Sequence, residues 1–442
     1  MRGTPCCFPL SVRTFLFLIL CVSQALSEPV PFRRAIELAL ARAEVSSPAV
    51  ADQQRARAAV QEARSAYLPH LTVGSGLGAT YGYPLSIEGS APSIFNVNYQ
   101  STLYNASQKA LTQAARETLR AQDWTIEDAR RNAALEAATT YVHLHNLESS
   151  RRALQQQSQE SSQLIGVMEA RVREGVEAQI ELTRARLLDA RTRMALVDAE
   201  GGLRVLRSRL AQLTGLAPAA IEIVPASIPA LPQPETQQDV VAQALAASAE
   251  VRAAEQQARA QELRAEAARK ARYPSVDLAA QYGLFSRINN YDEFFQRFQS
   301  NNATIGLAIR FPFLDYTQKA FAEVADAEAL RARQQLDQVR EQVATETLQL
   351  TQTENQLAIA AEVADLDRQL AQSNVDATQQ RIESEAPPAS GMRPVSPRDL
   401  QMARIEAEQR IVAALDAGFQ LQRARLQLLN AIGKLREWAL GN

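Results

Sequence analysis

The chain repeats one structural plan, and this duplication constrains its fold more than any other feature. Residues 35–69 and residues 240–274 lie about 205 positions apart, and both are rich in Ala, Arg and Gln. Each segment has the composition of a helix and stops at a proline, Pro69 or Pro274. A strand, a turn, a second strand and a very long helical stretch follow in each half. The sequence therefore predicts two helix–strand–strand–helix repeats.

The repeats divide the chain into segments. We expect the first repeat at residues 28–215 and the second at residues 237–442. A proline-rich linker at residues 216–236 joins them.

Residues 1–27 have the features of a secretory signal peptide. Basic residues precede an uninterrupted apolar run at residues 15–22, and small residues precede a cleavage site after Ser27. The run is shorter than the roughly 20 residues of a membrane-spanning helix, which argues against an uncleaved anchor. All three cysteines lie here, so a mature chain would hold no disulfide and no cysteine ligand or nucleophile. The sequence leaves open whether Cys21 is lipidated, although the bulky Leu20 before it is a poor lipoprotein signal.

The stretch TVGSGLGATYGY allows two interpretations. Its residues 74–79 match the G-x-G-x-x-A turn of dinucleotide-binding folds. That turn needs a helix to begin on the glycines, whereas aromatic residues, glycine and proline follow here. The glycines occupy every second position and alternate with mostly apolar residues, which is the period of a strand. We therefore expect a strand with lumen-facing or closely packed positions at Gly74, Gly76 and Gly78.

Three further segments, residues 93–104, 275–285 and 302–313, alternate in the same way. Each has about 10–12 residues, the length that crosses an outer membrane at a tilt. A soluble antiparallel sheet with one face in water would show the same alternation of apolar and polar residues. The secretory signal and the presence of the pattern in both repeats favour strands that cross a membrane. Four strands cannot close a barrel and lipid tolerates no open sheet edge, so the chain must oligomerise. The polar positions of these strands include the expected lumen residues Asn96, Asn98 and Arg310.

The helical segments predict a tube wall instead of a compact core. A helix at Ala106–Arg173 would be roughly 100 Å long. A turn near Gly175 leads to a return helix, Glu177–Leu213, which is about half as long. The helix before the strands, Arg33–Tyr67, supplies the other half. The matching helices of the second repeat are expected at Thr317–Ser384, Pro397–Leu440 and Asp239–Ala271. Antiparallel coiled coils of this kind build long walls.

Neither catalysis nor nucleic-acid binding is indicated. The formal net charge is −2, which gives no general attraction to nucleic acid. His143 and His145 are two positions apart on a helix, so they point to different sides and make a poor metal pair. His70 begins a strand, and the abundant Glu and Asp are typical of solvated helix faces. We therefore expect no catalytic residue, no metal site and no cofactor.

The order and spacing of these features resemble the TolC family of outer-membrane efflux proteins. The resemblance is carried by the strand openings at residues 67–69 and 273–274, the phrase RFPFLD at 310–315 and the turn RVREG at 171–175. It covers essentially all of the mature chain. It implies an α+β membrane protein with four β-strands per chain. Three chains would form a twelve-stranded β-barrel, continued by a long antiparallel coiled-coil α-barrel.

The resemblance also implies a passive exit duct in the bacterial outer membrane, with its helical tunnel in the periplasm. Such a duct serves a tripartite efflux or type I secretion system. The implied partners are two further copies in a homotrimer, a periplasmic adaptor (membrane fusion) protein, an inner-membrane pump and outer-membrane lipid, without nucleic acid. The alternative is a secreted coiled-coil structural protein without channel activity, which leaves the four symmetrically placed strands unexplained.

Family members close at the periplasmic end, so the resemblance assigns gate and adaptor contacts to the two helical tips. The candidate residues are Arg171, Arg173, Gly175, Glu181, Arg393 and Asp399. Asp399 falls where the family often has a pore-narrowing aspartate, and three copies would raise its pKa by like-charge repulsion. A solvated acid at a helix start is the alternative for this residue. The second tip, residues 384–399, is longer than the first and contains four prolines, which departs from the family pattern.

Overall fold

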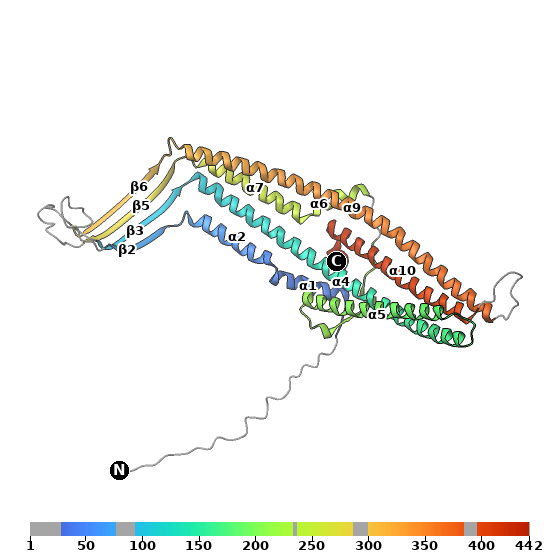
Figure 1. The fold of residues 1–442 in the computed structure, drawn as a ribbon. Helices are drawn as coiled ribbons and strands as arrows, with labels where there is room; N and C mark the ends of the chain where they lie inside the picture. Colours follow the sequence, from blue (N-terminus) through green and yellow to red (C-terminus); the bar gives the residue numbers. More distant parts are fainter. Residues whose placement is uncertain (1–27, 77–92, 233–236, 286–298, 384–395, 442) are drawn as a thin grey trace, which may run out of the picture.

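The computed structural model describes residues 28–76, 93–232, 237–285, 299–383 and 396–441. The chain forms an elongated rod, with a four-stranded sheet at one end and long helices running away from it (Figure 1). None of the described helices is both long enough and apolar enough to cross a membrane.

Two helices run the whole length of the helical part. α4 (Ala106–Arg173) and α9 (Tyr316–Glu383) contain 68 residues each. Next to the sheet, α2 (Pro48–Ser65) packs on α4, and α7 (Ala249–Lys270) contacts both α4 and α9. Alanine fills much of the interface between α4 and α7, and its small side chain lets the two helix backbones lie close together. The buried alanines include Ala110, Ala114, Ala121, Ala258, Ala260, Ala265 and Ala267.

The far half of the rod is built by the two return helices. α5 (Gln179–Thr214) packs on α4, and α10 (Pro397–Ala431) packs on both α9 and α4. The long helices and the α5 helix agree with the sequence predictions to within two residues at each end. The helical part is therefore a pair of coiled-coil hairpins, in which α10 joins one hairpin to the other.

Three helices that the sequence predicts as continuous are broken near the middle of the rod, which corrects those predictions. The segment Arg33–Tyr67 divides into α1 (Phe32–Ser46) and α2. The break lies at Ser47, whose hydroxyl accepts a hydrogen bond from the Ala49 N–H at 3.3 Å, while Pro48 starts the new helix.

The second repeat breaks at the equivalent place. The segment Asp239–Ala271 divides into α6 (Gln237–Ala247) and α7, because the Ser248 hydroxyl accepts a hydrogen bond from the Val251 N–H at 3.2 Å. The segment Pro397–Leu440 divides into α10 and α11 (Leu435–Leu440). Gly433 ends the longer helix with a φ of 76°, a conformation that glycine adopts without strain.

The main hydrophobic core lies around these breaks. The Phe32 ring packs edge-on against Tyr141 and Trp438, with centroid distances of 5.4 Å in both cases. The Tyr141 hydroxyl donates to the Val30 carbonyl and accepts from the Val224 N–H, both at 2.8 Å. One buried tyrosine thus holds the start of the described chain against the connection between the two halves.

A two-stranded parallel sheet in this region is not predicted from the sequence. β1 (Glu28–Val30) pairs with β4 (Ile221–Ile223), which lies inside the expected linker. Two short 3₁₀ helices, η1 (Pro218–Ala220) and η2 (Pro225–Ser227), flank β4. Strands of three residues are too short to show a period of two, which is why pattern analysis misses them.

The four-stranded sheet is antiparallel, in the order β2-β3-β5-β6. Its strands are β2 (His70–Gly76), β3 (Ser93–Tyr104), β5 (Ser275–Phe285) and β6 (Asn301–Arg310). The predictions for β3 and β5 are confirmed. The prediction for β6 extends too far, because the strand stops at Arg310, two residues before a proline that cannot donate to a sheet.

The register places four of the expected lumen residues, from β2, β3 and β6, on one polar face. Gly74 lies opposite Asn96, and the same parity continues across β5 and β6. Gly74, Asn96, Asn98 and Arg310 share this face. A Cβ on Gly74 would lie 2.9 Å from the Asn96 Oδ1, so a larger residue there would require the Asn96 side chain to move. Gly76 follows a register shift and pairs with Ser93, whereas Gly78 is outside the described residues.

Candidate gate at the helical tip

The first turn at the far end of the rod is tight and closed by hydrogen bonds. α4 ends at Arg173, and Gly175 takes a φ of 73°, which lets the chain reverse toward α5. The N–H groups of Val176 and Glu177 both donate to the Arg171 carbonyl, at 2.9 and 3.3 Å. Gly175 and Arg171 therefore shape the turn through their backbones.

A cluster of ion pairs joins this turn to the start of α10. The Arg398 guanidinium donates from Nη1 to the Glu177 Oε1 at 3.1 Å and from Nη2 to the Glu181 Oε2 at 2.9 Å. Arg171 approaches the same Glu177 oxygen at 3.5 Å. The two glutamate side chains are only 15% and 17% exposed, so they are better shielded than ordinary surface charges. Arg398 thereby fastens the α9–α10 hairpin to the α4–α5 hairpin.

An apolar cluster lies beneath the ion pairs. Ile405 of α10 packs among residues of α4 and α5, and these are Leu164, Met168, Leu182 and Ala185. A cavity of about 240 Å³ lies between this cluster and the Arg398 side chain. The tip is therefore filled by side chains from three helices but keeps some free space directly under the salt bridge.

Asp399 caps its own helix. The Ser396 N–H and the Ser396 hydroxyl both lie 2.8 Å from the Asp399 Oδ2, and the Asp399 N–H faces back to Ser396, which makes a capping box. This geometry agrees with the alternative role of Asp399, that of an acid at the start of a helix. A ring of three Asp399 side chains in a pore stays a prediction.

The structure brings together only some of the residues predicted for the tip. Arg171 and Glu181 take part in the ion-pair cluster, and Arg173 lies exposed in the last turn of α4. Arg393 lies outside the described residues. The sequence analysis missed Arg398 and Glu177, although opposite charges at the two tips were a usable signal.

A second polar layer joins α4 and α10 further from the tip. Glu160 is 7% exposed, and its Oε2 lies 3.9 Å from Nη1 of Arg404. On the same helix as Arg404, burial raises the pKa of the Glu408 carboxyl, and the negative charge of Glu160 raises it further. Two carboxylates therefore lie near each other between the two hairpins.

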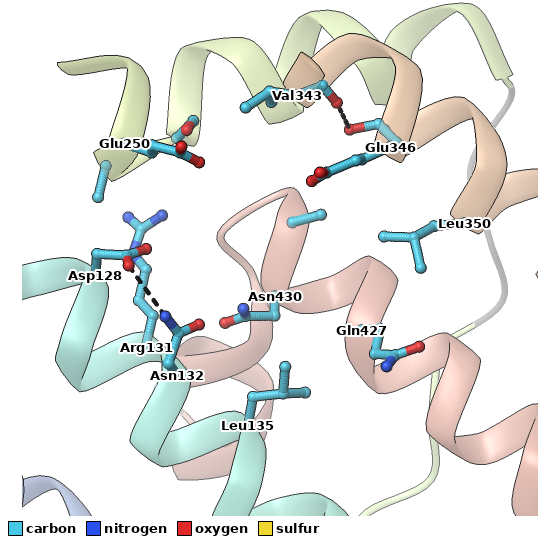
Figure 2. Close-up of a pocket in the computed structure, with 14 residues that line it drawn as sticks. Asp128, Arg131, Asn132, Leu135, Glu250, Val343, Glu346, Leu350, Gln427 and Asn430 are labelled. Carbon is cyan, nitrogen blue, oxygen red and sulfur yellow. Dashed lines mark hydrogen bonds between the residues drawn. The ribbon is translucent and has the colours of Figure 1, made fainter. Parts of the chain in front are cut away.

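A third polar region lies near the middle of the rod, in a cavity of about 330 Å³ between α4, α7, α9 and α10. Figure 2 shows the carboxylates of Asp128, Glu250 and Glu346 around it, with Arg131 between the first two. Arg131 donates to the Ala247 carbonyl at 2.7 Å and so holds the end of α6. Burial raises the pKa of both Asp128 and Glu250, and the neighbouring acids add to the effect on Glu250.

Of the three histidines that the sequence analysis considered, His143 and His145 lie on α4 and His70 begins β2. His143 stacks on Phe419 with a centroid distance of 4.2 Å, and burial lowers the pKa of both His143 and His145. Among the described residues, no group of three His, Cys, Asp or Glu side chains is arranged to hold a metal ion.

A family model described as outer membrane efflux protein matches residues 35–216. No curated protein matches the chain. Solved structures of low sequence identity match nearly all of it. The outer membrane protein VceC from Vibrio cholerae is 18% identical, with a TM-score of 0.72 over 91% of this chain and 96% of VceC.

Two further solved structures give the same result. The CmeC outer membrane channel from Campylobacter jejuni is 14% identical, with a TM-score of 0.71 over 91% of this chain and 86% of CmeC. The open state of the MtrE outer membrane channel from Neisseria gonorrhoeae is 19% identical, with a TM-score of 0.68 over 94% of both chains.

The fold is TolC-like, with four antiparallel strands and long helices in each chain, and it is shared with solved outer-membrane channels. The outer membrane efflux protein family matches the first repeat, residues 35–216, which is less than half of the chain. Proteins of this family are channels and not enzymes. The alternative of a secreted coiled-coil protein does not account for a sheet that is shared with outer-membrane channels.

Proposed function

We propose that three copies of the chain form one closed duct, which takes cargo from a periplasmic adaptor and an inner-membrane pump and releases it outside the cell. TolC-family channels are homotrimers, and the features of this chain support the same assembly. Movement through the duct is passive, and the pump supplies the energy.

The main support for this proposal comes from the two open edges of the four-stranded sheet. Within the described chain, β2 and β6 each pair on one side only, and all ten residues of β6 are exposed. The hydrocarbon part of a membrane contains no water to satisfy free backbone N–H and C=O groups. Pairing β6 of one copy with β2 of the next satisfies them and closes a barrel of twelve strands.

Apolar stripes on the helices support the same arrangement. On α5 the exposed stripe consists of Ile180, Leu187, Met194, Val197 and Val205. On α9 it consists of Ile359, Val363, Leu366 and Leu370. These side chains are between 50% and 68% exposed in one chain. Most of them are spaced by three, four or seven positions, the spacing of a coiled-coil seam, so α5 of one copy fits against α9 of the next.

The ion pairs at the tip give the duct a closing device. Arg398 holds the α9–α10 hairpin against the α4–α5 hairpin at the end that would meet the adaptor. Loss of this contact frees the inner ends of the helices to move outward. We propose that adaptor binding competes for Arg398, Glu177 and Glu181 and so opens the periplasmic end.

The proposal is tested with the purified full chain in detergent and in planar lipid bilayers. We expect a trimer band on gels without heating, a monomer band after heating, and discrete single-channel openings. Well-folded protein that stays monomeric, or that gives no openings at any voltage, would show that the proposal is wrong. Circular dichroism of the same sample establishes that the protein is folded.

A further inference from the structure

The four-stranded sheet carries one isolated charged pair. Among its described residues, Asp277 on β5 and Arg310 on β6 are the only Asp, Glu, Lys or Arg side chains. They bind each other, because the Arg310 Nη2 donates to the Asp277 Oδ2. The Thr102 hydroxyl on β3 donates to the other carboxylate oxygen at 2.8 Å. Three neighbouring strands thus meet at one carboxylate.

The register puts this pair on the polar face. Asp277 lies opposite Thr102 on β3 and opposite Ala308 on β6. Arg310 lies opposite Ser275, which is two positions before Asp277 on β5. The opposite face carries Leu278, Tyr282, Ile305 and Leu307 at the alternate positions. In a membrane barrel the apolar face meets lipid, so the polar face with Arg310 meets the water inside.

The two charges differ in what they present to that water. The Arg310 side chain is 67% exposed, whereas the Asp277 side chain is 5% exposed. The carboxylate is buried at the wall with both of its oxygens bound, and the guanidinium covers it. An ion that passes close to this wall therefore meets the positive end of the pair first.

We propose that Arg310 determines the charge selectivity of the channel at the point where the sheet passes into the helices, and that Asp277 is the residue that positions it. Arg310 is the last residue of β6, directly before the segment that leads to α9 (Figure 1). The inference rests on the proposed homotrimer, in which three copies place three guanidinium groups at one level. Rings of Arg or Lys favour anions, so carboxylate, sulfonate or phosphate groups pass this level more readily than cations.

The test is the reversal potential of the purified full-length channel in a planar bilayer with a KCl gradient. At about 0.1 M salt we expect Arg310→Gln to raise the ratio of K⁺ to Cl⁻ permeability by at least about twofold. Arg310→Lys keeps the charge and should keep most of the wild-type ratio. Asp277→Asn leaves the guanidinium without its counter-charge and should shift the ratio toward Cl⁻.

Salt separates an electrostatic role from a structural one. The Debye length falls from about 10 Å at 0.1 M to about 3 Å at 1 M, so the shift in Arg310→Gln should largely disappear at the higher concentration. A shift that persists unchanged at 1 M, or an equal ratio in wild type and Arg310→Gln at 0.1 M, would overturn the inference.

Arg310→Gln leaves a buried carboxylate without its partner, and such a variant can fail to assemble. The comparison of Asp277→Asn with the double variant Asp277→Asn/Arg310→Gln avoids this problem, because position 277 is neutral in both and only the charge at 310 differs. Equal ratios in these two variants also contradict the inference. If the variants form channels whose selectivity is unchanged, only this inference is wrong. If the folded wild-type protein forms no channels, the proposed duct itself is wrong.

Discussion

Arg398 on α10 and Glu181 on α5 form a 2.9 Å ion pair although 217 residues separate them in the sequence. The pair connects two coiled-coil hairpins that otherwise meet through the packing of α10 on α4. Because Arg398 also binds Glu177, one guanidinium closes both the turn and the contact between hairpins. A contact of this kind can be broken without removing any apolar packing.

The first prediction concerns this contact. Arg398→Gln should raise the open probability of the channel about tenfold, if each of three bridges contributes about 0.5 kcal/mol to the closed state. Single-channel recording measures this directly. Arg410→Gln is the matched control, because Arg410 binds Asp367 at 3.1 Å within the α9–α10 hairpin. Equal open probabilities in the Arg398→Gln and Arg410→Gln channels would contradict the proposed lock.

The second prediction concerns Asp399. Asp399→Ala removes the acceptor for the Ser396 N–H and should destabilise the first turn of α10 by about 1 kcal/mol. Hydrogen exchange of the amides at the start of α10 should become faster, while Asp399→Asn keeps part of the cap. If Asp399 also narrows the pore of the trimer, both variants should weaken block by divalent cations. Unchanged block would leave Asp399 with the capping role alone.

The third prediction concerns the glycines of β2. Gly76→Arg introduces a long charged side chain, so we expect a clearly lower single-channel conductance if this position faces the lumen. Calorimetry should detect no binding of NAD to the wild-type chain. Measurable NAD binding would revive the dinucleotide interpretation, and an unchanged conductance would place Gly76 away from the lumen.

The fourth prediction concerns pH. The raised pKa of Glu408 means that the folded chain binds this proton more tightly than the unfolded chain does. Stability is therefore highest when Glu408 is protonated and falls as pH rises from the ordinary glutamate value through the raised one. Glu408→Gln should increase the thermal midpoint at about pH 8 and have little effect at about pH 4.

The exposed Glu406 on the same helix supplies the control for this experiment. Glu406→Gln removes an exposed carboxyl group, so it should change the thermal midpoint by a similar amount at both pH values. The predicted sign would be wrong if the wild type became more stable relative to Glu408→Gln as the pH rises. The quantity to compare is the difference between the two thermal midpoints at each pH.

The fifth prediction concerns assembly. Leu187→Glu places a charge in the apolar stripe of α5, and burying it against a neighbouring chain without a partner would cost several kcal/mol. We expect loss of the heat-modifiable trimer band, with the helix content of the monomer unchanged. Leu187→Met conserves the apolar volume and should assemble normally. A stable trimer of the Glu variant would mean that this stripe lies outside the interface.

Local sequence patterns are enough to locate most of the helices and strands. Alternation with a period of two marks β3 and β5, Gly175 marks the turn after α4, and Pro69 and Pro274 mark the ends of the helices before the strands, because such signals act over a few neighbouring residues. The breaks at Ser47 and Ser248 were hidden, because a single capping serine changes little in a long window with high helix propensity.

Contacts between distant residues depend on how the whole chain packs. The pairing of β1 with β4, the contact of Arg398 with Glu177 and Glu181, and the pair of Asp277 and Arg310 each join segments that are far apart or on different elements. Local propensity carries no information about such neighbours. They are set by how the hairpins pack and by the register of the sheet, where a slip of one residue would move Arg310 to the opposite face.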